Sequence, residues 1–566
     1  EAGMIRHADG ARLLDDAHLT LDAEGHPPDR DNRGATPLPR RASLAWEGAR
    51  LADVAVLAPY LPPGAPIALS GGQAESQGHL ALEDERVSGG LRLSGDRISG
   101  RLLDEAVTGE MTLDLALREA SLDGRLLDLS GSRLALSATA GNAEPDRRLG
   151  TVLVARQARF TGLDEPAARQ GRLVLEGMVD RLGFLDAFLP REHGLALRGR
   201  GRLAADLRLR GERLLSGSHL RVDADDLSVG FLDYRAQGRG ELEARLEGVA
   251  PAVRLRLSLP RFALRREAEQ ERTWLAGRHL TLETTAPRFS LDPAALDIAE
   301  VTTRVALPIV EVPDLALYNA YLPEAAGVAL RGGRASLEAT LDLEGLSARG
   351  DLVLQGFGTE LRLAEQRLTG DLRLEARLRE GDLQARRFDA SGSLLRLDNV
   401  TRRDPDGQGE VGWWARLALE EGELTWAEPL EVNARLGLAM RDSGLLARLF
   451  LAGARERDWL GRRLTVRDIR GEARLSLDAE GIRLDEARLT GGPLALLADL
   501  RFHDERLEGR LHARLGRLAV GIGLQDGERT LRFWQPRRWF EGSAEEAQPA
   551  LEETTSEAFR EALSTP

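Results

Sequence analysis

One phrase of sixteen residues recurs three times in this chain, and its spacing constrains the fold more than any other feature. Each copy contains an aromatic residue, a Leu-Pro pair, a leucine seven residues after the proline and a glycine two residues later. The copies are LAPYLPPGAPIALSGG at 57–72, LDAFLPREHGLALRGR at 185–200 and YNAYLPEAAGVALRGG at 318–333. The steps between Pro62, Pro190 and Pro323 are 128 and 133 residues. A fixed period of this size predicts one structural unit repeated along the chain.

A fourth, weaker copy follows about one period later. It reads LLARLFLAG at 445–453, without the Leu-Pro pair, and its strand part reappears as IRGEARLSL at 469–477, so an insertion is expected there. The length of 566 residues agrees with four units of roughly 130 residues. The predicted division is lead-in strands and a loop over 1–45, repeat 1 over 46–173, repeat 2 over 174–305, repeat 3 over 306–438, an atypical repeat 4 over 439–541 and an acidic tail over 542–566.

Composition and charge exclude several classes of protein. The net charge of −14 opposes non-specific binding to nucleic acid. The chain has no cysteine, and all of its Lys and Arg positions are arginine. Disulfides and cysteine nucleophiles are therefore excluded, as are phosphate-binding loops and pyridoxal Schiff bases, which need lysine. The longest uncharged run, 54–74, holds four prolines and cannot form a membrane-spanning helix.

Between the phrases, leucine falls on every second residue and polar residues fill the positions between. This alternation is typical of a strand with one apolar and one wet face. Pairs such as Gly95-Asp96, Asp123-Gly124, Gly350-Asp351 and Gly370-Asp371 predict antiparallel hairpins, with about one strand per 10–12 residues and so about 40–50 strands. The leucines predicted to share the apolar face are Leu80, Leu82, Leu91, Leu93, Leu113, Leu115, Leu117, Leu207, Leu209, Leu337, Leu341, Leu343, Leu372, Leu374 and Leu378.

Few helices are expected. Short ones over 53–61 and 182–189 have helical apolar spacing and end at Leu-Pro. Gly71, Gly199 and Gly332 then begin a strand or allow a bulge. Residues 24–40 are predicted to form a loop, and 543–563 an acidic helix or a disordered tail.

A sheet with one apolar face must cover that face, and few helices are expected to do so. Such sheets can close into barrels, stack in pairs or curl into a trough, and the sequence leaves this choice open. An inner trough face would expose far more apolar surface than soluble monomers normally do. An apolar guest is then expected, and lipid acyl chains fit because each buried methylene contributes about 0.8 kcal/mol.

Recognisable catalytic and metal-binding motifs are missing. There is no HExxH motif, no HxxxH pair and no GxSxG motif. Residues 404–410 fail the spacing of a calcium loop and are predicted to form a hairpin turn, while the acidic cluster 223–226 is predicted to be a solvated edge. His503 and His512 are expected to face solvent or to pack. A general acid–base pair among the many carboxylates can be neither picked out nor excluded. We expect no enzymatic activity, no cofactor and no metal.

Two aromatic features stand out in a chain that has only 4% aromatic residues. Tyr60, Tyr318 and Tyr321 lie in the phrases, where they are expected to pack the short helix onto the sheet rather than contact lipid or a partner. The segment 532–540, RFWQPRRWF, combines Trp with Arg, which suits either a membrane interface or a protein dock, or else a strand that caps the last repeat. The candidate partner or membrane contacts are Phe533, Trp534, Trp539 and Phe540.

The stretch 314–343, DLALYNAYLP followed by GVALRGGRASLEATLDL, resembles the recurring unit of the AsmA-like family of Gram-negative envelope proteins. The resemblance covers most of the chain through its repeats. It implies a long periplasmic β-groove, tethered by an N-terminal inner-membrane anchor, that carries phospholipids between the inner and outer membranes. The sequence departs from this pattern in showing no anchor and in the fourth repeat, which lacks Leu-Pro. A tethering segment is therefore expected before residue 1.

Together these features predict an all-β protein, an elongated and curled antiparallel sheet of about four repeats with few short helices. The predicted function is a periplasmic groove that binds acyl chains and conducts phospholipids, with inner- and outer-membrane proteins as candidate partners. The first alternative is a scaffold for assembly of outer-membrane proteins, and the second is an extracellular β-repeat adhesin or passenger. A carbohydrate-active enzyme is disfavoured because aromatic platforms for sugars are scarce.

Overall fold

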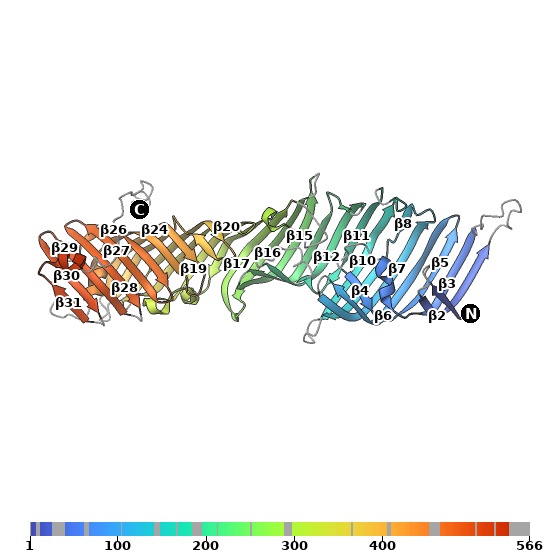
Figure 1. The fold of residues 1–566 in the computed structure, drawn as a ribbon, viewed down its shortest axis with the longest axis horizontal. Helices are drawn as coiled ribbons and strands as arrows, with labels where there is room; N and C mark the ends of the chain where they lie inside the picture. Colours follow the sequence, from blue (N-terminus) through green and yellow to red (C-terminus); the bar gives the residue numbers. More distant parts are fainter. Residues whose placement is uncertain are drawn as a thin grey trace. The chain divides into compact units, whose positions relative to one another are not determined.

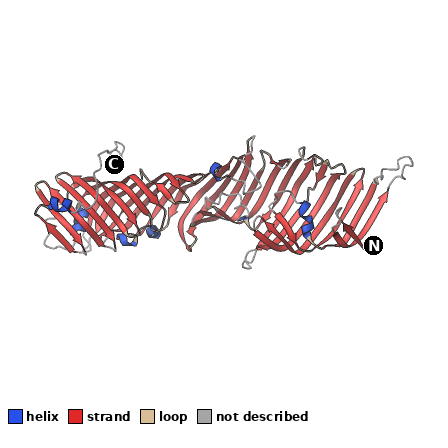
Figure 2. Ribbon diagram, in the orientation of Figure 1, coloured by secondary structure: helices blue, strands red, loops and turns tan. Residues whose placement is uncertain are grey.

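The prediction of an all-β chain with few short helices is confirmed (Figure 2). A computed structural model gives 31 strands among the described residues, assigned to one antiparallel sheet. No helix among the described residues is long and apolar enough to cross a membrane. The division into four repeats remains a prediction. The structure describes residues 2–6, 12–24, 40–60, 67–102, 105–140, 148–165, 168–183, 195–211, 213–231, 233–248, 252–287, 297–363, 366–403, 409–451, 465–503, 506–525 and 528–542.

By its internal contacts the chain divides into two compact units. Unit 1 comprises Glu1–Phe262 with Thr281–Thr303, and unit 2 comprises Ala263–Leu280 with Arg304–Pro566. Within each unit the long strands follow one another in chain order, each paired with the next (Figure 1). The predicted loop at 24–40 lies largely outside the described residues, as do the predicted turn at 404–410 and the tail at 543–563.

Unit 1 is built from strands that mostly run 8 to 17 residues. They are β1 (Ala2–Arg6), β2 (Arg12–Glu24), β3 (Arg41–Leu51), β4 (Ile67–Gly71), β5 (Ala74–Glu83), β6 (Arg86–Leu102), β7 (Glu105–Ser121), β8 (Leu126–Asp128), β9 (Arg133–Ala140), β10 (Arg148–Thr161), β11 (Gln170–Val179), β12 (Ala196–Arg210), β13 (Arg213–Leu214), β14 (His219–Phe231) and β15 (Tyr234–Glu247).

Three strands contribute residues to both units: β16 (Ala252–Arg266), β17 (Glu269–Ala286) and β18 (Thr302–Val312). Unit 2 continues with β19 (Val328–Glu344), β20 (Ser347–Leu363), β21 (Gln366–Asp382), β22 (Arg387–Asp389), β23 (Leu394–Arg403), β24 (Gly409–Thr425), β25 (Glu431–Asp442), β26 (Arg467–Asp478), β27 (Gly481–Gly491), β28 (Leu494–His503), β29 (Arg506–Leu515), β30 (Leu518–Gln525) and β31 (Glu528–Arg532).

The strands are fewer and longer than predicted, because three of the four expected hairpin turns lie inside strands. Gly95, Gly350 and Gly370 each lie beside a register shift, in β6, β20 and β21. A side chain at Gly95 would place its Cβ 2.5 Å from the carbonyl oxygen of Gln73, so glycine is required by close packing of the backbones. Only Asp123-Gly124 forms the expected turn, between β7 and β8.

The repeated phrases form short helices, as predicted, but as tighter 3₁₀ turns. These are η1 (Val54–Tyr60) and η6 (Leu315–Tyr321), followed by η7 (Glu324–Ala326). The fourth, weaker phrase forms α1 (Gly444–Leu451). The remaining helices among the described residues are η5 (Ile298–Glu300) and α3 (Pro536–Gly542). The predicted helix at 182–189 lies mostly outside the described residues.

Each of these phrase helices begins beside an aspartate, whose capping role was not predicted from the sequence. The Asp53 carboxylate accepts from the Ala55 amide at 2.9 Å, and the Asp314 carboxylate accepts from the Ala316 amide at the same distance. At the fourth phrase, Asp442 accepts from the Gly444 amide at 2.9 Å. A carboxylate in this position satisfies an amide that the helix itself leaves unpaired.

The glycines after the phrases allow bulges, as predicted. Register shifts lie beside Gly71 in β4 and beside Gly332 in β19. In β12, Gly199 has φ +129, and a Cβ there would lie 1.9 Å from the Asp226 carbonyl oxygen. The register of β12 against β14 shifts between Arg200 and Gly201, and the extra residue, Asp225, lies in β14. Only a residue without a side chain fits such a close backbone approach.

A second repeated element, Ser-Gly-Ser, joins three neighbouring strands. At 391–393 the Ser391 hydroxyl accepts from the Gly422 amide and the Ser393 hydroxyl accepts from the Arg377 amide, both at 3.0 Å. The same pair of bonds occurs at 130–132, where the acceptors are Ser130 and Ser132. The glycines of these elements are 261 residues apart, as are Pro62 and Pro323. This agreement links the element to the period of the phrases.

Candidate functional site: an apolar face of the sheet

Strand pairing places one row of apolar residues across ten strands of unit 1. Each member lies directly opposite the next, so all side chains of the row share one face of the sheet. Ser76 is its only polar member. The row, called row 1, comprises Ala49, Ser76, Leu93, Leu113, Leu134, Leu153, Gly177, Leu203, Val222 and Leu242.

Unit 2 has a matching row across eleven strands, and every member is apolar or glycine. Leu354, Leu374 and Leu395 of this row lie 261 residues after three members of row 1. Three neighbouring leucines of row 1 therefore recur in row 2 at one constant spacing. This row, called row 2, comprises Leu337, Leu354, Leu374, Leu395, Leu417, Leu438, Gly471, Leu489, Leu496, Ala513 and Val520.

The predicted lining leucines lie in these rows or in the rows beside them. Leu93 and Leu113 belong to row 1, and Leu337 and Leu374 belong to row 2. The others lie an even number of strand positions away, or opposite such positions, on the same faces: Leu80, Leu82, Leu91, Leu115, Leu117, Leu207, Leu209, Leu341, Leu343, Leu372 and Leu378.

Burial along the apolar face is uneven, and the candidate site is the part of the face whose leucines are only half-buried. In the central strands of unit 2, Leu372, Leu374 and Leu395 are half-buried. In unit 1, Leu113 and Leu134 are half-buried as well. Toward the end of unit 2 the face closes on itself, where Leu496, Leu511 and other residues of β26 to β30 form a core with α1. The half-buried leucines are thus the part of the face that a guest could cover.

The expectation that nothing else in the chain covers this face is wrong at the phrases. Val54 of η1 is fully buried against Leu93 and Ile98 of β6. Leu315 of η6 lies over Gly333 and Gly356, 3.2 Å from where a Cβ on Gly356 would be. The phrase helices therefore pack on the apolar face, and their hydrophobic spacing fits that contact.

An aromatic cluster in unit 2 holds η6 against a distant hairpin. Trp274 of β17 contacts Tyr318 and Tyr321 edge-on, at centroid distances of 5.3 and 6.1 Å. Tyr321 in turn meets Trp426, in the turn between β24 and β25, at 5.3 Å, and its carbonyl accepts from the Leu430 amide at 3.0 Å. Burial raises the pKa of the Tyr318 hydroxyl. The packing role expected for the phrase tyrosines is seen for these two.

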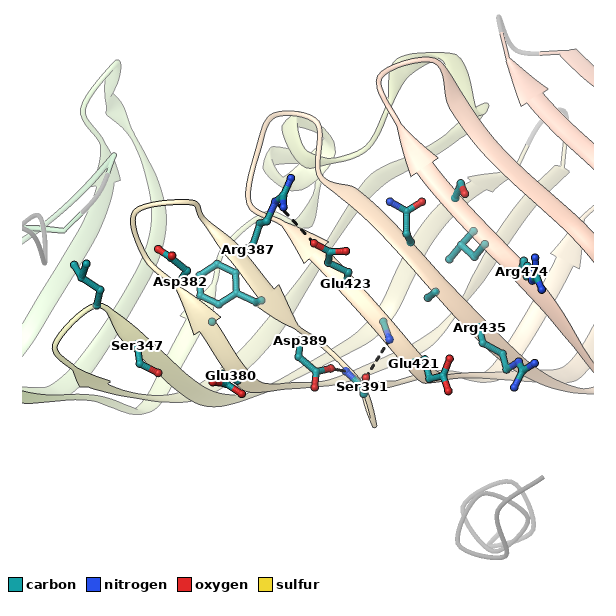
Figure 3. Close-up of a pocket in the computed structure, with 18 residues that line it drawn as sticks. Ser347, Glu380, Asp382, Arg387, Asp389, Ser391, Glu421, Glu423, Arg435 and Arg474 are labelled. Atoms are coloured by element: carbon teal, nitrogen blue, oxygen red, sulfur yellow. Dashed lines mark hydrogen bonds and ion pairs between the residues drawn. The ribbon is translucent and has the colours of Figure 1, made fainter. Parts of the chain in front are cut away.

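A hollow of about 1030 Å³ lies against β21, β22, β24, β25 and β26 of unit 2, and both charged and apolar residues line it (Figure 3). Asp389 and Glu423 lie opposite each other in its wall, and Arg387 approaches Glu423 at 3.8 Å. Hydrogen bonds from the Ser391 side chain and backbone hold the pKa of Asp389 below its usual range. The described residues of the lining include no histidine.

The aromatic segment near the end of the described chain is divided between packing and exposure. Phe540 of α3 is buried beside His512, and Trp539 lies over Gly521 of β30. Phe533 and Trp534 are 63% and 84% exposed. The helix thus caps β29 and β30, and only the first two aromatics remain available for a membrane or a partner.

The acidic cluster 223–226 and the histidines His503 and His512 were predicted to have no chemical role. Asp223, Asp225 and Asp226 are exposed, and Asp225 pairs with Arg239 at 2.7 Å. His503 lies 2.9 Å from Glu508, whereas His512 is buried. Within the described ranges no group of three or more His, Asp or Glu residues could hold a metal ion.

No protein-family model matches the chain, and neither a curated protein nor a solved structure is significantly similar to it.

Proposed function

We propose that the chain binds lipid acyl chains along its apolar face, through the half-buried leucines of rows 1 and 2. The observation that carries this proposal is the presence of a continuous apolar row in each unit, with three neighbouring leucines of row 1 recurring in row 2 at one constant spacing. A face lined by aliphatic side chains gains about 25 cal/mol for each Å² of apolar surface that a guest covers. It offers few polar groups to fix one pose, so a bound chain can shift along the rows.

Conduction of phospholipids between two membranes is the further step of the proposal. It rests on the resemblance of 314–343 to the AsmA-like family, and so do periplasmic placement and an inner-membrane tether. Inner- and outer-membrane proteins remain proposed partners on the same basis. No catalytic step is proposed.

The test compares two variants, one with a carboxylate added to the apolar face and one with a carboxylate added to the polar face. Bound lipid and lipid transfer are measured for both. The protein is purified in mild detergent from a bacterial host, and bound lipids are counted by mass spectrometry. Transfer of labelled phospholipid between vesicles is measured in parallel. Leu374→Glu, in row 2, is expected to lower both quantities several-fold, because an unpaired carboxylate on the apolar face opposes acyl chains.

Gln355→Glu is the matched control. Gln355 lies on the polar face of β20, directly opposite Arg373, and the added carboxylate meets a cation there. It is expected to leave lipid content and transfer unchanged. Equal lipid content in the two variants, with both folded, would contradict the proposal.

A scaffold that pairs with strands of other proteins is the second candidate, and one observation favours it. Among the described residues β31 pairs with β30 alone, so its other edge is free to accept a strand. The exposed Phe533 and Trp534 directly follow this edge. Recovery of β-barrel precursors instead of lipid with the purified protein would favour this function over lipid binding.

A further inference from the structure

One polar group interrupts the apolar face in unit 2. Thr359 is only 4% exposed, and its hydroxyl oxygen has no hydrogen-bond partner. It adjoins a hollow of about 20 Å³ whose other walls are glycine or apolar. The walls are Leu330, Leu361, Leu368, Gly370, Leu372, Leu397 and Val400. A buried hydroxyl without a partner is costly, so its presence calls for a ligand group or a water.

A bulge in β20 places this hydroxyl on the apolar face. The register of β20 against β21 shifts between Gly356 and Thr359, which turns Phe357 outward to 68% exposure. Gly358 allows the bulge with φ +59. Without the extra residue, Thr359 would point to the polar face, since neighbouring strand positions alternate. Gly356 leaves space for the hydroxyl, because a Cβ there would lie 2.5 Å from the Thr359 oxygen.

The shape and chemistry of the hollow favour a single oxygen carried by an apolar molecule. Its volume is enough for one water, but a buried water needs two to four polar partners. Thr359 is the only wall residue with a polar side chain. A carbonyl oxygen needs only one donor and arrives covalently attached to the apolar chain beside it.

We propose that the Thr359 hydroxyl donates a hydrogen bond to an ester carbonyl of a bound acyl lipid, and that unit 2 thereby distinguishes ester lipids from ether lipids. The inference rests on the proposed function and adds the linkage chemistry of the ligand. The half-buried Leu372 and Leu374 lie close by on the same face and would contact the acyl chain.

The experiment compares two probes with the full chain. Vesicles of dioleoyl phosphatidylcholine and vesicles of its ether-linked analogue are each incubated with the protein, and the lipid retained by the separated protein is counted. One hydrogen bond of about 1 kcal/mol corresponds to about a fivefold preference for the ester lipid. Thr359→Val, which keeps the side-chain shape, is expected to remove the preference while ether-lipid binding is retained. Thr359→Ser is expected to keep it.

Equal retention of both lipids by the unaltered protein would overturn this inference and leave the proposed function intact. A preference that survives in Thr359→Val would also overturn it, since another group would then recognise the ester. Retention of neither lipid would overturn the proposed function and this inference together.

Discussion

The ring of Tyr321 packs edge-on against the ring of Trp426, with 5.3 Å between their centroids, although the two residues are 105 positions apart in the chain. The contact joins the end of a phrase helix to the turn between β24 and β25. Arg266 forms an ion pair with Glu428, which is two residues after Trp426. The Arg266 guanidinium also lies over the Trp274 ring, 5.9 Å from its centroid. The sheet of unit 2 is therefore curled far enough for a helix at one strand end to meet a hairpin several strands away.

This aromatic contact is expected to contribute measurable coupling energy. Tyr321→Leu and Trp426→Leu should each destabilise unit 2, and together they should cost about 1 kcal/mol less than the sum of the two. Urea unfolding followed by tryptophan fluorescence measures the three free energies of unfolding. Trp534→Leu, at an 84% exposed side chain, is the control and should change the unfolding free energy little. Strict additivity of the two substitutions would show that the contact contributes nothing.

The Ser-Gly-Ser element should stabilise the strands that it joins. Ser393 is buried, and Ser393→Ala leaves the Arg377 amide without its acceptor, at an expected cost of about 1–2 kcal/mol. Ser336→Ala, at an exposed position of β19, should cost less than about 0.5 kcal/mol. The measurement is the midpoint of chemical unfolding, and equal midpoints for the two variants would refute the role assigned to the element.

Gly199 is expected to tolerate no side chain. Gly199→Ala adds a Cβ that would lie 1.9 Å from the Asp226 carbonyl oxygen, at a φ that alanine disfavours, so β12 must separate from β14 at that point. A loss of more than about 2 kcal/mol is expected. The control is Gly48→Asn, where φ is +64, no atom lies within 4 Å of the added Cβ, and asparagine accepts the conformation. Hydrogen exchange of the β12 amides locates the effect.

Acid should weaken the end of unit 2 through His512. Burial, and then the charges of Arg537 and Arg514, lower the pKa of this histidine from its usual 6.5. The unfolded chain takes up a proton below about pH 6.5 that the folded chain refuses, so the unfolding free energy falls as the pH falls through this range. Thermal melts at pH 7.5 and 5.5 should show this loss, and His512→Phe should reduce it. His79→Gln, at an exposed histidine, should leave it unchanged.

The sequence predicted the strands, their apolar face and the phrase helices because these follow from local periodicity. Alternating Leu372 and Leu374 fix a face wherever the strand lies. The same reasoning failed at Gly350-Asp351, since this pair lies inside β20 beside a register shift, and only the pairing with the neighbouring strands distinguishes this from a turn. Asp314 at the start of η6 carried a helix-capping signal that could have been read from its position before the apolar run.

The candidate site was predictable in part. Parity alone places Leu341 and Leu374 on one face, but not the depth to which each is covered. Val54 and Leu315 cover the apolar face because the phrase helices fold back over the sheet. Their partners are distant in sequence, so local periodicity cannot predict these contacts. The position of Thr359 on the apolar face depends on a one-residue bulge, and period-two counting from Leu354 assigns it to the opposite face.

The most direct measurement is photo-crosslinking from the two faces of the sheet in the envelope of living cells. Benzoylphenylalanine is placed at Leu374 in one variant and at Gln355 in another, and the adducts are identified by mass spectrometry. Lipid adducts at position 374 and none at 355 are the predicted result. Lipid-free protein at both positions, or adducts of equal yield on both faces, would contradict the account.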